Sequence, residues 1–359
     1  MNKSEEVESI YSKRASRWKL IVVLLIIVLF ITSVLSLNVG YAQIPFIDIL
    51  RILARQIPFL NSLVPSSLVS STEEAIILQI RMPRILTGVL VGAALAAAGV
   101  LYQGIFKNPM ADSYVLGVSA GASVGASLSI LFGIGFTFLG VGIAQIAAFV
   151  GALLTIFLVY NISRVGSRVP ISTLLLSGIA VSIFLSAIVA ILQVIAGERL
   201  HVIVFWLIGG FSNVQWKDVW AVLPFILIGV VAAYFFVRDL NLLALGDDTA
   251  QHLGVNVDKV KKWLLVLSSL ITAAAVSISG IIGFIGLMIP HMTRLVIGPD
   301  HRILLPTSTI IGAIFLVICD AVARVIIAPA ELPVGVITAL SGGPFFIYLL
   351  RKKKGGYAL

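Results

Sequence analysis

Charged side chains inside apolar runs are the first residues of this sequence that could do chemistry. Asp320 and Arg324 lie four residues apart in one such run, and Arg294 and Glu331 lie at comparable depth in the sequence pattern. Opposite charges four residues apart can pair on one helix, so we interpret Asp320 and Arg324 as a structural ion pair. A proton relay would need more buried acids than these. This weakens the interpretation of the chain as an ion-coupled secondary transporter.

Catalytic and metal-binding motifs are absent. The sequence has no G-x-x-x-x-G-K-[ST] phosphate-binding loop, no H-E-x-x-H pair and no G-x-S-x-G nucleophile motif. Its four histidines form no spaced ligand pair, and its single cysteine, Cys319, lies in an apolar run. We therefore assign no catalytic residue, no metal and no cofactor. An intramembrane enzyme, with His291 and Asp320 as its reagents, is the more distant alternative.

The composition indicates a membrane protein. Of the 359 residues, 59% are hydrophobic and only 11% are charged, and the mean hydropathy is +1.11. A soluble domain carries about 25% charged residues, so the lipid bilayer is the solvent that this chain needs. The net charge of +9 does not indicate nucleic acid as a partner, because the basic residues lie between apolar runs, where membrane topology places them.

Ten apolar runs have about the length that crosses a bilayer. They cover residues 20–37, 84–106, 114–132, 140–160, 171–196, 219–237, 263–282, 284–298, 303–328 and 334–350. The run 284–298 is short, so we expect it to be tilted, broken or buried in protein. The sequence therefore predicts an all-α membrane protein with about ten transmembrane helices, forming one domain over 20–350.

An even number of spans places both termini on one side of the membrane. Most Lys and Arg residues fall in the segments on that side, which the positive-inside rule assigns to the cytoplasm. We therefore expect cytoplasmic tails at 1–19 and 351–359, a cytoplasmic loop at 238–262 and an extracytoplasmic segment at 38–80. The predicted location is the cell membrane, which the chain crosses many times.

Two segments outside the membrane are expected to be short helices. Phe46, Ile49, Leu50 and Leu53 have helical spacing, which predicts a helix lying with this face on the membrane surface. The apolar stretch 202–210 is too short to span, so we expect a partial helix packed among the others.

The cytoplasmic loop contains a third short helix in this prediction. Gly246 precedes Asp247, which suits a helix N-terminus, and Gly254 supplies a stop. Leu243, Leu245 and Leu253 are apolar but have no bilayer to enter. They either pack under the helix bundle or form a docking surface for a cytoplasmic partner, and the loop alone does not decide between the two.

Small and hydroxyl side chains recur on two of the predicted spans. Ser172, Thr173 and Ser177 begin such a series on one span, and Gly335 and Thr338 begin another. Small residues usually allow close packing of helices. Lining a polar translocation path is the other interpretation, and both hold if the path follows a seam between two copies of the chain.

An internal repeat is also indicated. Residues 99–117 match residues 280–298 in the spacing of their Gly and Pro residues. By the predicted topology the two copies begin on opposite sides of the membrane, which is the inverted repeat common in transporters.

Several motifs in residues 75–352 resemble those of one family. They are Arg81-Met82-Pro83-Arg84, Gln103 with Lys107-Asn108-Pro109-Met110-Ala111, Leu116-Gly117-Val118-Ser119-Ala120-Gly121-Ala122, Trp206 with Gly209-Gly210, Leu243-Ala244-Leu245-Gly246, Gly283-Phe284-Ile285-Gly286-Leu287-Met288-Ile289-Pro290-His291, Asp300-His301-Arg302, Glu331-Leu332-Pro333-Val334-Gly335 and Gly343-Pro344. In this order they resemble the FecCD-type permease subunit of type II ABC importers, which take up iron-siderophores, haem or cobalamin. Residues 39–80 match none of these motifs, and Met110 stands where Leu is usual.

The resemblance implies partners and roles. It implies a homodimer of permeases, two cytoplasmic ATP-binding subunits and an extracytoplasmic substrate-binding protein, with ATP hydrolysed outside this chain. The substrate would be a ferric siderophore or a similar metal chelate, with haem and cobalamin as rivals. Arg81, Arg84 and Arg324 would dock the binding protein, with Pro83 in the first turn of the second span. Asn108, Met110, Ser172, Thr173 and Ser177 would line the path and its cytoplasmic gate. ATPase coupling would involve Leu243, Leu245, Gly246, Asp247, Leu253 and Gly254.

Overall fold

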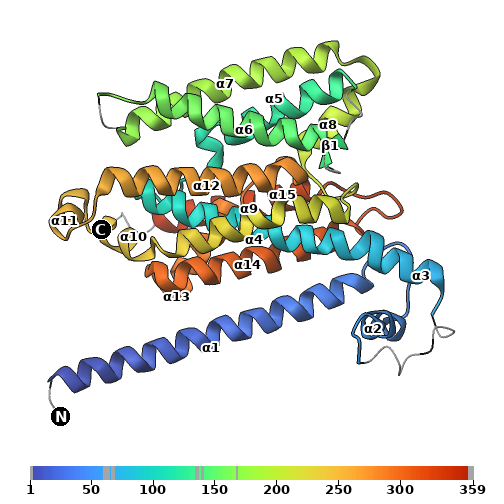
Figure 1. Cartoon of the computed structure of the whole chain (residues 1–359), viewed down its shortest axis with the longest axis horizontal. Coiled ribbons are helices and arrows are strands. Elements are labelled where there is room, and N and C mark those ends of the chain that lie inside the picture. The colour runs from blue at the N-terminus through green and yellow to red at the C-terminus, as the bar shows by residue number, and fades with distance from the viewer. Residues whose placement is uncertain are drawn as a thin grey trace.

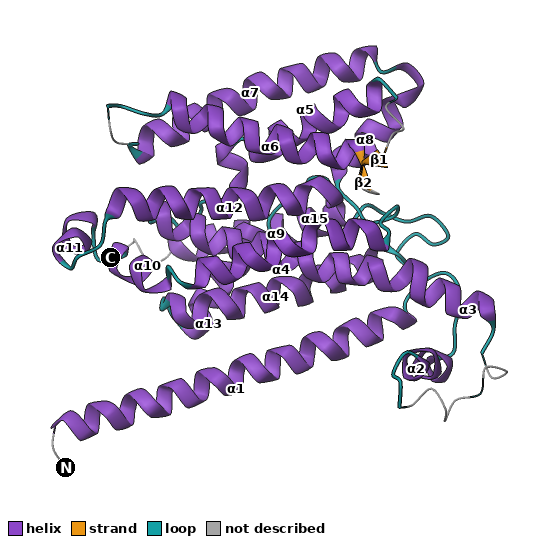
Figure 2. Ribbon diagram, viewed as in Figure 1, coloured by secondary structure: helices purple, strands orange, loops and turns teal. Residues whose placement is uncertain are grey.

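The structure, a computed structural model, describes residues 3–59, 65, 69–133, 137–138, 141–166 and 169–354. Parts of four predicted segments lie outside these ranges, namely 1–2 of the N-terminal tail, 60–64 and 66–68 of the extracytoplasmic segment, residue 140 of the run 140–160 and 355–359 of the C-terminal tail. The described chain consists of helices joined by loops, with one small hairpin of β1 (Thr137–Phe138) and β2 (Val141–Gly142) (Figure 2). The fold class predicted from the sequence is confirmed.

Ten helices in the described part have the apolar character of membrane spans. Seven are long enough to cross, and three shorter apolar helices accompany them. The long ones are α1 (Lys3–Asn38), α4 (Met82–Phe106), α6 (Ile143–Ile162), α7 (Ile171–Ile195), α9 (Trp216–Tyr234), α12 (Val257–Ser279) and α14 (His301–Ala323); the shorter ones are α5 (Val118–Leu131), α13 (Ile285–Ile297) and α15 (Val334–Lys354). They coincide with the ten predicted runs.

The remaining helices are short. They are α2 (Phe46–Arg55), α3 (Ser71–Ala75), the π-helix η3 (Ile76–Arg81), the 3-10 helices η4 (Ser113–Leu116) and η5 (Gly197–Arg199), α8 (Leu200–Ile208), α10 (Val237–Leu243) and α11 (Asp247–His252). Figure 1 places α2 and α3 at one end of the molecule, and α10, α11 and the start of α1 at the other. We call these the α2 end and the α11 end.

Helix α4 forms the centre of the bundle, and most of its residues are buried. It contacts α9, α12, α13 and α14, while α5, α6 and α7 form a separate layer against α12 (Figure 1). Close approach depends on glycine. A Cβ added at Gly92 would overlap the backbone of Gly312 on α14, and one at Gly99 would overlap the carbonyl oxygen of Gly286 on α13. Small residues thus bring backbones together here, as packing in membranes requires.

The second span begins differently from the prediction. Helical structure runs without a break from Ser71 through η3 into α4, so Pro83 lies well inside a helix and not in a free first turn. Proline removes one helical hydrogen bond and crowds the preceding turn. Here Met82 alone separates it from the π-helical segment Ile76–Arg81, where the helix is already wider than an α-helix.

The surface helix α2 is confirmed, but its buried face is not the predicted one. Ile49 and Ile52 are fully buried against Leu37, Ile77 and neighbouring residues, whereas Phe46 and Leu50 are exposed. The helix therefore packs its most apolar stripe on protein at the α2 end. The partial helix expected at 202–210 is α8, which ends where Gly209 takes a positive φ of 79°.

The proposed repeat holds for only part of the local backbone. Gly117 and Gly298, which end the two copies, both have positive φ, at 78° and 101°. Asn108-Pro109 lies in the turn after α4, however, whereas the matching Ile289-Pro290 lies inside α13. The spacing of Gly and Pro is thus shared by segments of different secondary structure.

Candidate functional site

At the α2 end, the three predicted docking arginines form one buried cluster with two acids. Arg84 pairs through its Nε with Asp320 at 2.9 Å and through a terminal nitrogen with Glu331 at 2.6 Å. Arg324 pairs with Asp320 at 3.2 Å, one turn away on the same helix. The ion pair expected from the spacing of Asp320 and Arg324 is therefore confirmed, and a second arginine shares it.

The same cluster holds the C-terminal end of α1. Arg81 donates to the carbonyl oxygen of Leu37 at 2.6 Å and to that of Ala42. Arg324 donates to the carbonyl oxygens of Ser36 and Val39 at 3.1 and 2.6 Å. The last carbonyl groups of a helix have no partner within the helix, and these two guanidinium groups supply partners.

Burial limits what this cluster can contact. All three arginines are about 95% buried and have internal acceptors, whereas Glu331 is 39% exposed at its side chain. The sequence interpretation pictured exposed cationic anchors, and that picture does not fit this arrangement. In this conformation a protein docking at the α2 end would meet Glu331 before it met the arginines.

At the α11 end, the cytoplasmic loop divides into an anchored half and an exposed half. Leu240 and Leu243 on α10 are fully buried. Leu245 and Leu253 are 65% and 53% exposed, on either side of α11. Helix α11 begins at Asp247 after Gly246, whose φ is 121°, and it ends before Gly254, whose φ is 88°. Both boundaries agree with the sequence prediction.

Polar contacts fix α10 and α11 to the spanning helices. Asp247 accepts from Lys107, just past α4, at 2.7 Å, and also from Lys261 on α12. Partial burial alone would raise the pKa of Asp247, but these two hydrogen bonds and charges hold it below the ordinary value. Asn241 on α10 donates to Asp300 and accepts from the backbone of His301, at the start of α14. These contacts hold α10 and α11, and with them the exposed Leu245 and Leu253, in a fixed position on the spanning helices.

The two predicted gate residues lie in a turn that is joined to α11. Asn108 and Met110 are exposed in the turn that follows α4, and the Asn108 side chain accepts from the backbone N–H of Met110 at 2.9 Å. Lys107 begins that turn in a left-handed conformation with a φ of 48°. Lys107 and its partner Asp247 thus join the turn directly to α11.

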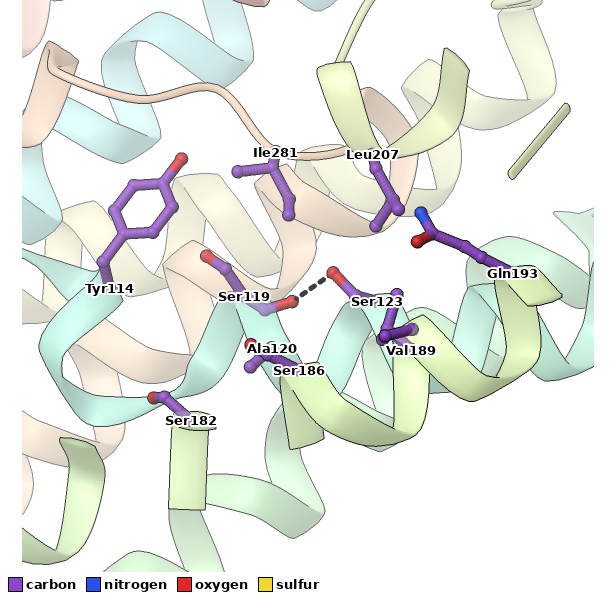
Figure 3. Close-up of a pocket in the computed structure, with 11 residues that line it drawn as sticks. Tyr114, Ser119, Ala120, Ser123, Ser182, Ser186, Val189, Gln193, Leu207 and Ile281 are labelled. Atoms are coloured by element: carbon purple, nitrogen blue, oxygen red, sulfur yellow. Dashed lines mark hydrogen bonds between the residues drawn. The ribbon is translucent and has the colours of Figure 1, made fainter. Parts of the chain in front are cut away.

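A cavity of about 360 Å³ lies between η4, α5, α7 and α8. Figure 3 shows its polar lining, which comes from Tyr114, Ser119 and Ser123 on one side and from Ser182, Ser186 and Gln193 of α7 on the other. The predicted path residues lie earlier on α7, where Ser172 is exposed, Thr173 is half-buried and Ser177 is buried. None of these three lines the cavity.

Two polar residues not assigned as site residues connect α4 to α13. Gln103 donates to the carbonyl oxygens of Gly286 and Leu287 at 3.2 and 3.1 Å, and Arg294 donates to Gln103 at 2.9 Å. The sequence signal that could have identified Gln103 is a single glutamine within an apolar run. In the described ranges, no three side chains of His, Cys, Asp or Glu are grouped as metal ligands.

The helix bundle, the polar cavity of Figure 3 and the exposed surface around α11 together define a polytopic membrane permease. A sequence profile described as the FecCD transport family matches residues 25–352. The chain belongs to this family, and it is the permease subunit of an ABC importer located in the cell membrane.

Relatives in the family carry names with different substrates. A cobalamin import permease of Halobacterium salinarum is 46% identical, covering 80% of this chain and 76% of its own length. A hemin transport permease of Yersinia pestis is 40% identical, with 79% and 86% covered. An Fe(3+)-citrate import permease of Bacillus subtilis is 38% identical, with 95% and 97% covered.

Solved structures agree with the assigned fold. One, described as an inward-facing conformation of a metal-chelate type ABC transporter, has a TM-score of 0.79 and 34% identity, covering 92% of this chain and 99% of its own. A second, PsaBC from Streptococcus pneumoniae in complex with Fab, has a TM-score of 0.52 and 19% identity, covering 75% and 90%. At that identity the second likeness concerns the fold alone.

Proposed function

We propose that this chain is the membrane path of an ATP-driven importer for a ferric siderophore or a similar metal chelate. The exposed surface around α11, which polar contacts hold in place, is the observation that supports ATP coupling most directly. It presents Leu245 and Leu253 to solvent on a loop tied to three spanning helices by Asp247 and Asn241. We infer that the two leucines form part of a contact with another protein, because exposed apolar residues mark such contacts when they form a continuous patch.

The proposal includes an assembly. Two copies of the chain form a homodimer, two ATP-binding subunits dock on the α11 end from the cytoplasm, and a substrate-binding protein docks on the α2 end. Both termini are then cytoplasmic. The α2 end carries Glu331 at its surface, with Arg81, Arg84 and Arg324 behind it. Docking through the arginines would require Glu331 to move aside or to share Arg84 with an acid of the binding protein.

The substrate is the finer part of this proposal. Iron-citrate, hemin and cobalamin all occur in the names of relatives, and cobalamin is the second candidate because the relative with that name is 46% identical. The polar cavity in Figure 3 has a few hydroxyl and amide groups among apolar ones, a lining typical of sites for organic ligands.

The test is ATP hydrolysis by the complete complex in lipid nanodiscs. The permease, its ATP-binding subunit and its binding protein are assembled, and the binding protein is loaded in turn with a ferric siderophore, haem or cobalamin. We expect the ferric siderophore to stimulate hydrolysis most and to be carried into proteoliposomes only with ATP. Stimulation by cobalamin alone would replace the proposed substrate, and uptake driven by an ion gradient without ATP would contradict the proposed mechanism.

A further inference from the structure

A groove of about 520 Å³ lies between α6 and α12, away from the cavity of Figure 3. Helices α6 and α12 contact each other, and Figure 1 shows that α12 begins, and α6 ends, toward the α11 end of the molecule. Most of the lining is apolar, and it includes Leu153, Ile156, Phe157, Leu265, Val266 and Leu270. None of these residues belongs to the surface around α11 or to the arginine cluster at the α2 end.

The groove has the depth of one lipid leaflet. From Leu153 to Arg164 it follows α6 and its end for about 16 Å, at the 1.5 Å rise per residue of a helix. From Lys262 to Leu270 it follows α12 for about 12 Å by the same measure. The hydrocarbon core of a bilayer is about 30 Å thick, so half of it is about 15 Å.

Two cations stand at the end of the groove. Arg164 and Lys262 both line it and both are exposed. The Nε of Arg164 donates to the carbonyl oxygen of Gly166, and no described residue accepts from its terminal nitrogens. Lys262 has no ion-pair partner among the described residues, even though Asp258 lies one turn away, whereas the neighbouring Lys261 is paired with Asp247. These charges therefore remain available for a ligand.

The groove ends in the polar groups expected at a membrane surface. Tyr160 and Asn161 line it between the apolar part and Arg164. Tyrosine is enriched where a helix meets the lipid headgroups. Apolar walls one leaflet deep, with two cations at headgroup level, match a molecule that has an acyl chain joined to a phosphate. Basic pockets between spanning helices are known to hold such headgroups.

We propose that this groove is a binding site for an anionic phospholipid of the leaflet at the α11 end. One acyl chain lies along Phe157 and Val266, and the headgroup phosphate is held by Arg164 and Lys262. A zwitterionic lipid offers the same chains without net negative charge, so it binds more weakly. The site is separate from the proposed substrate path, and it does not depend on which substrate the importer carries.

The test measures lipid retained by the purified full-length permease in detergent, by native mass spectrometry, during titration with dioleoylphosphatidylglycerol or dioleoylphosphatidylcholine. We expect one phosphatidylglycerol to bind in preference to phosphatidylcholine. Arg164→Ala with Lys262→Ala should weaken that binding about thirtyfold, because each cation near the surface contributes roughly a fivefold factor. Arg164→Lys with Lys262→Arg should keep most of it.

Two further variants separate this site from nonspecific attraction. Arg17→Ala with Lys19→Ala removes two exposed cations from the N-terminal half of α1, a helix that starts at the α11 end, and should leave the retained lipid unchanged. Val266→Trp keeps every charge but fills the groove from a position that is 46% exposed, and it should release the lipid while the fold is kept. Inorganic phosphate should not compete, because it has no acyl chain.

Three outcomes would overturn the proposal. Equal retention of the two lipids would remove the role of the cations. Loss of lipid in the Arg17 and Lys19 variant to the same extent would show general charge attraction only. Groove variants that change the oligomeric state but not the retained lipid would show that a second copy of the chain occupies the groove.

Discussion

Each buried charge in the cluster at the α2 end is compensated by neighbouring protein groups. Asp320 lies between Arg84 and Arg324, and Arg81 has only backbone acceptors. An uncompensated charge at this depth would be very unfavourable. The cluster is therefore first a structural element that joins α1, α4 and α14, and any docking role is added to this one.

Removing one arginine from the cluster tests its structural role. We expect Arg84→Ala to lower the free energy of unfolding by about 3 kcal/mol, near the lower end for a broken buried pair, because Asp320 keeps Arg324. Thermal unfolding of the purified permease in detergent measures the change. Arg51→Ala, which breaks the more exposed pair with Asp48, is the matched control and should cost at most about 1 kcal/mol.

The alternative outcome is equally informative. If Arg84→Ala left thermal stability unchanged and weakened only the binding of the substrate-binding protein, then the arginine would be a docking anchor and the structural account would be wrong.

The sequence predicted part of this cluster and could not predict the rest. The Asp320–Arg324 pair follows from helical spacing, because both partners lie on one turn. Arg84 joins it from 236 residues away, and Arg81 binds carbonyl oxygens that every residue has. No residue type marks such contacts, so their burial became visible only with the packing of α1 against α14.

Among the elements, α11 and its flanking leucines have the clearest predicted role. Leu245→Asp with Leu253→Asp should reduce co-purification of the ATP-binding subunit at least about tenfold, since an unpaired charge is costly to bury in a protein contact. The bundle should remain folded, because both positions are exposed. Affinity capture followed by size-exclusion chromatography measures both properties.

A variant of the buried half of the loop gives the comparison. Leu243→Asp places a charge at a fully buried position and should lower the yield of folded permease itself. If the Leu245 and Leu253 variant retained its ATP-binding subunit and transported normally, then α11 would not be the coupling element.

The contact between α4 and α13 depends on the absence of a side chain. We expect Gly99→Ala to destabilise the permease by about 1–3 kcal/mol, because the added methyl group overlaps the carbonyl oxygen of Gly286. Gly343→Ala on α15 is the control, because nothing lies within 4 Å of the added atom. Thermal unfolding of both variants should separate them, and equal stability would mean that α13 can move away from α4 at little cost.

The sequence predicted most of the helices, but it predicted less well which face of a helix is buried. Apolar length gave all ten spans, and glycines gave both ends of α11. The helix α2 was expected from Phe46, Ile49, Leu50 and Leu53, yet Ile52 is the buried neighbour of Ile49. Periodicity identifies a helix but does not say whether protein or lipid covers each stripe.

For the whole molecule, the turn at Asn108 and Met110 provides a test of the proposed homodimer. A cysteine at either position, in a Cys319→Ala background, should cross-link two copies in at least one state of the ATP cycle. Both positions are exposed, whereas Cys319 is buried and is removed only to prevent side reactions. A cross-linked dimer on a denaturing gel is the readout.

A cysteine on α1 controls for chance collisions. Leu20→Cys lies on the exposed surface of α1 and should not cross-link. Failure of both Asn108→Cys and Met110→Cys in every nucleotide state would exclude this turn from the seam between copies.

The attachment of α1 has a consequence for the order of biosynthesis. Only 11% of the most apolar window in its spanning part is buried, and two guanidinium groups hold its end. That of Arg81 comes 44 residues after its partner Leu37, whereas that of Arg324 comes 288 residues after Ser36. A ribosome must therefore make almost the whole chain before the second guanidinium group exists. Until then the spanning part of α1 lies mainly in lipid, which its mean hydropathy of 3.2 permits, the highest among the long spans. The end of α1 is thus attached in two steps, one early in synthesis and one late.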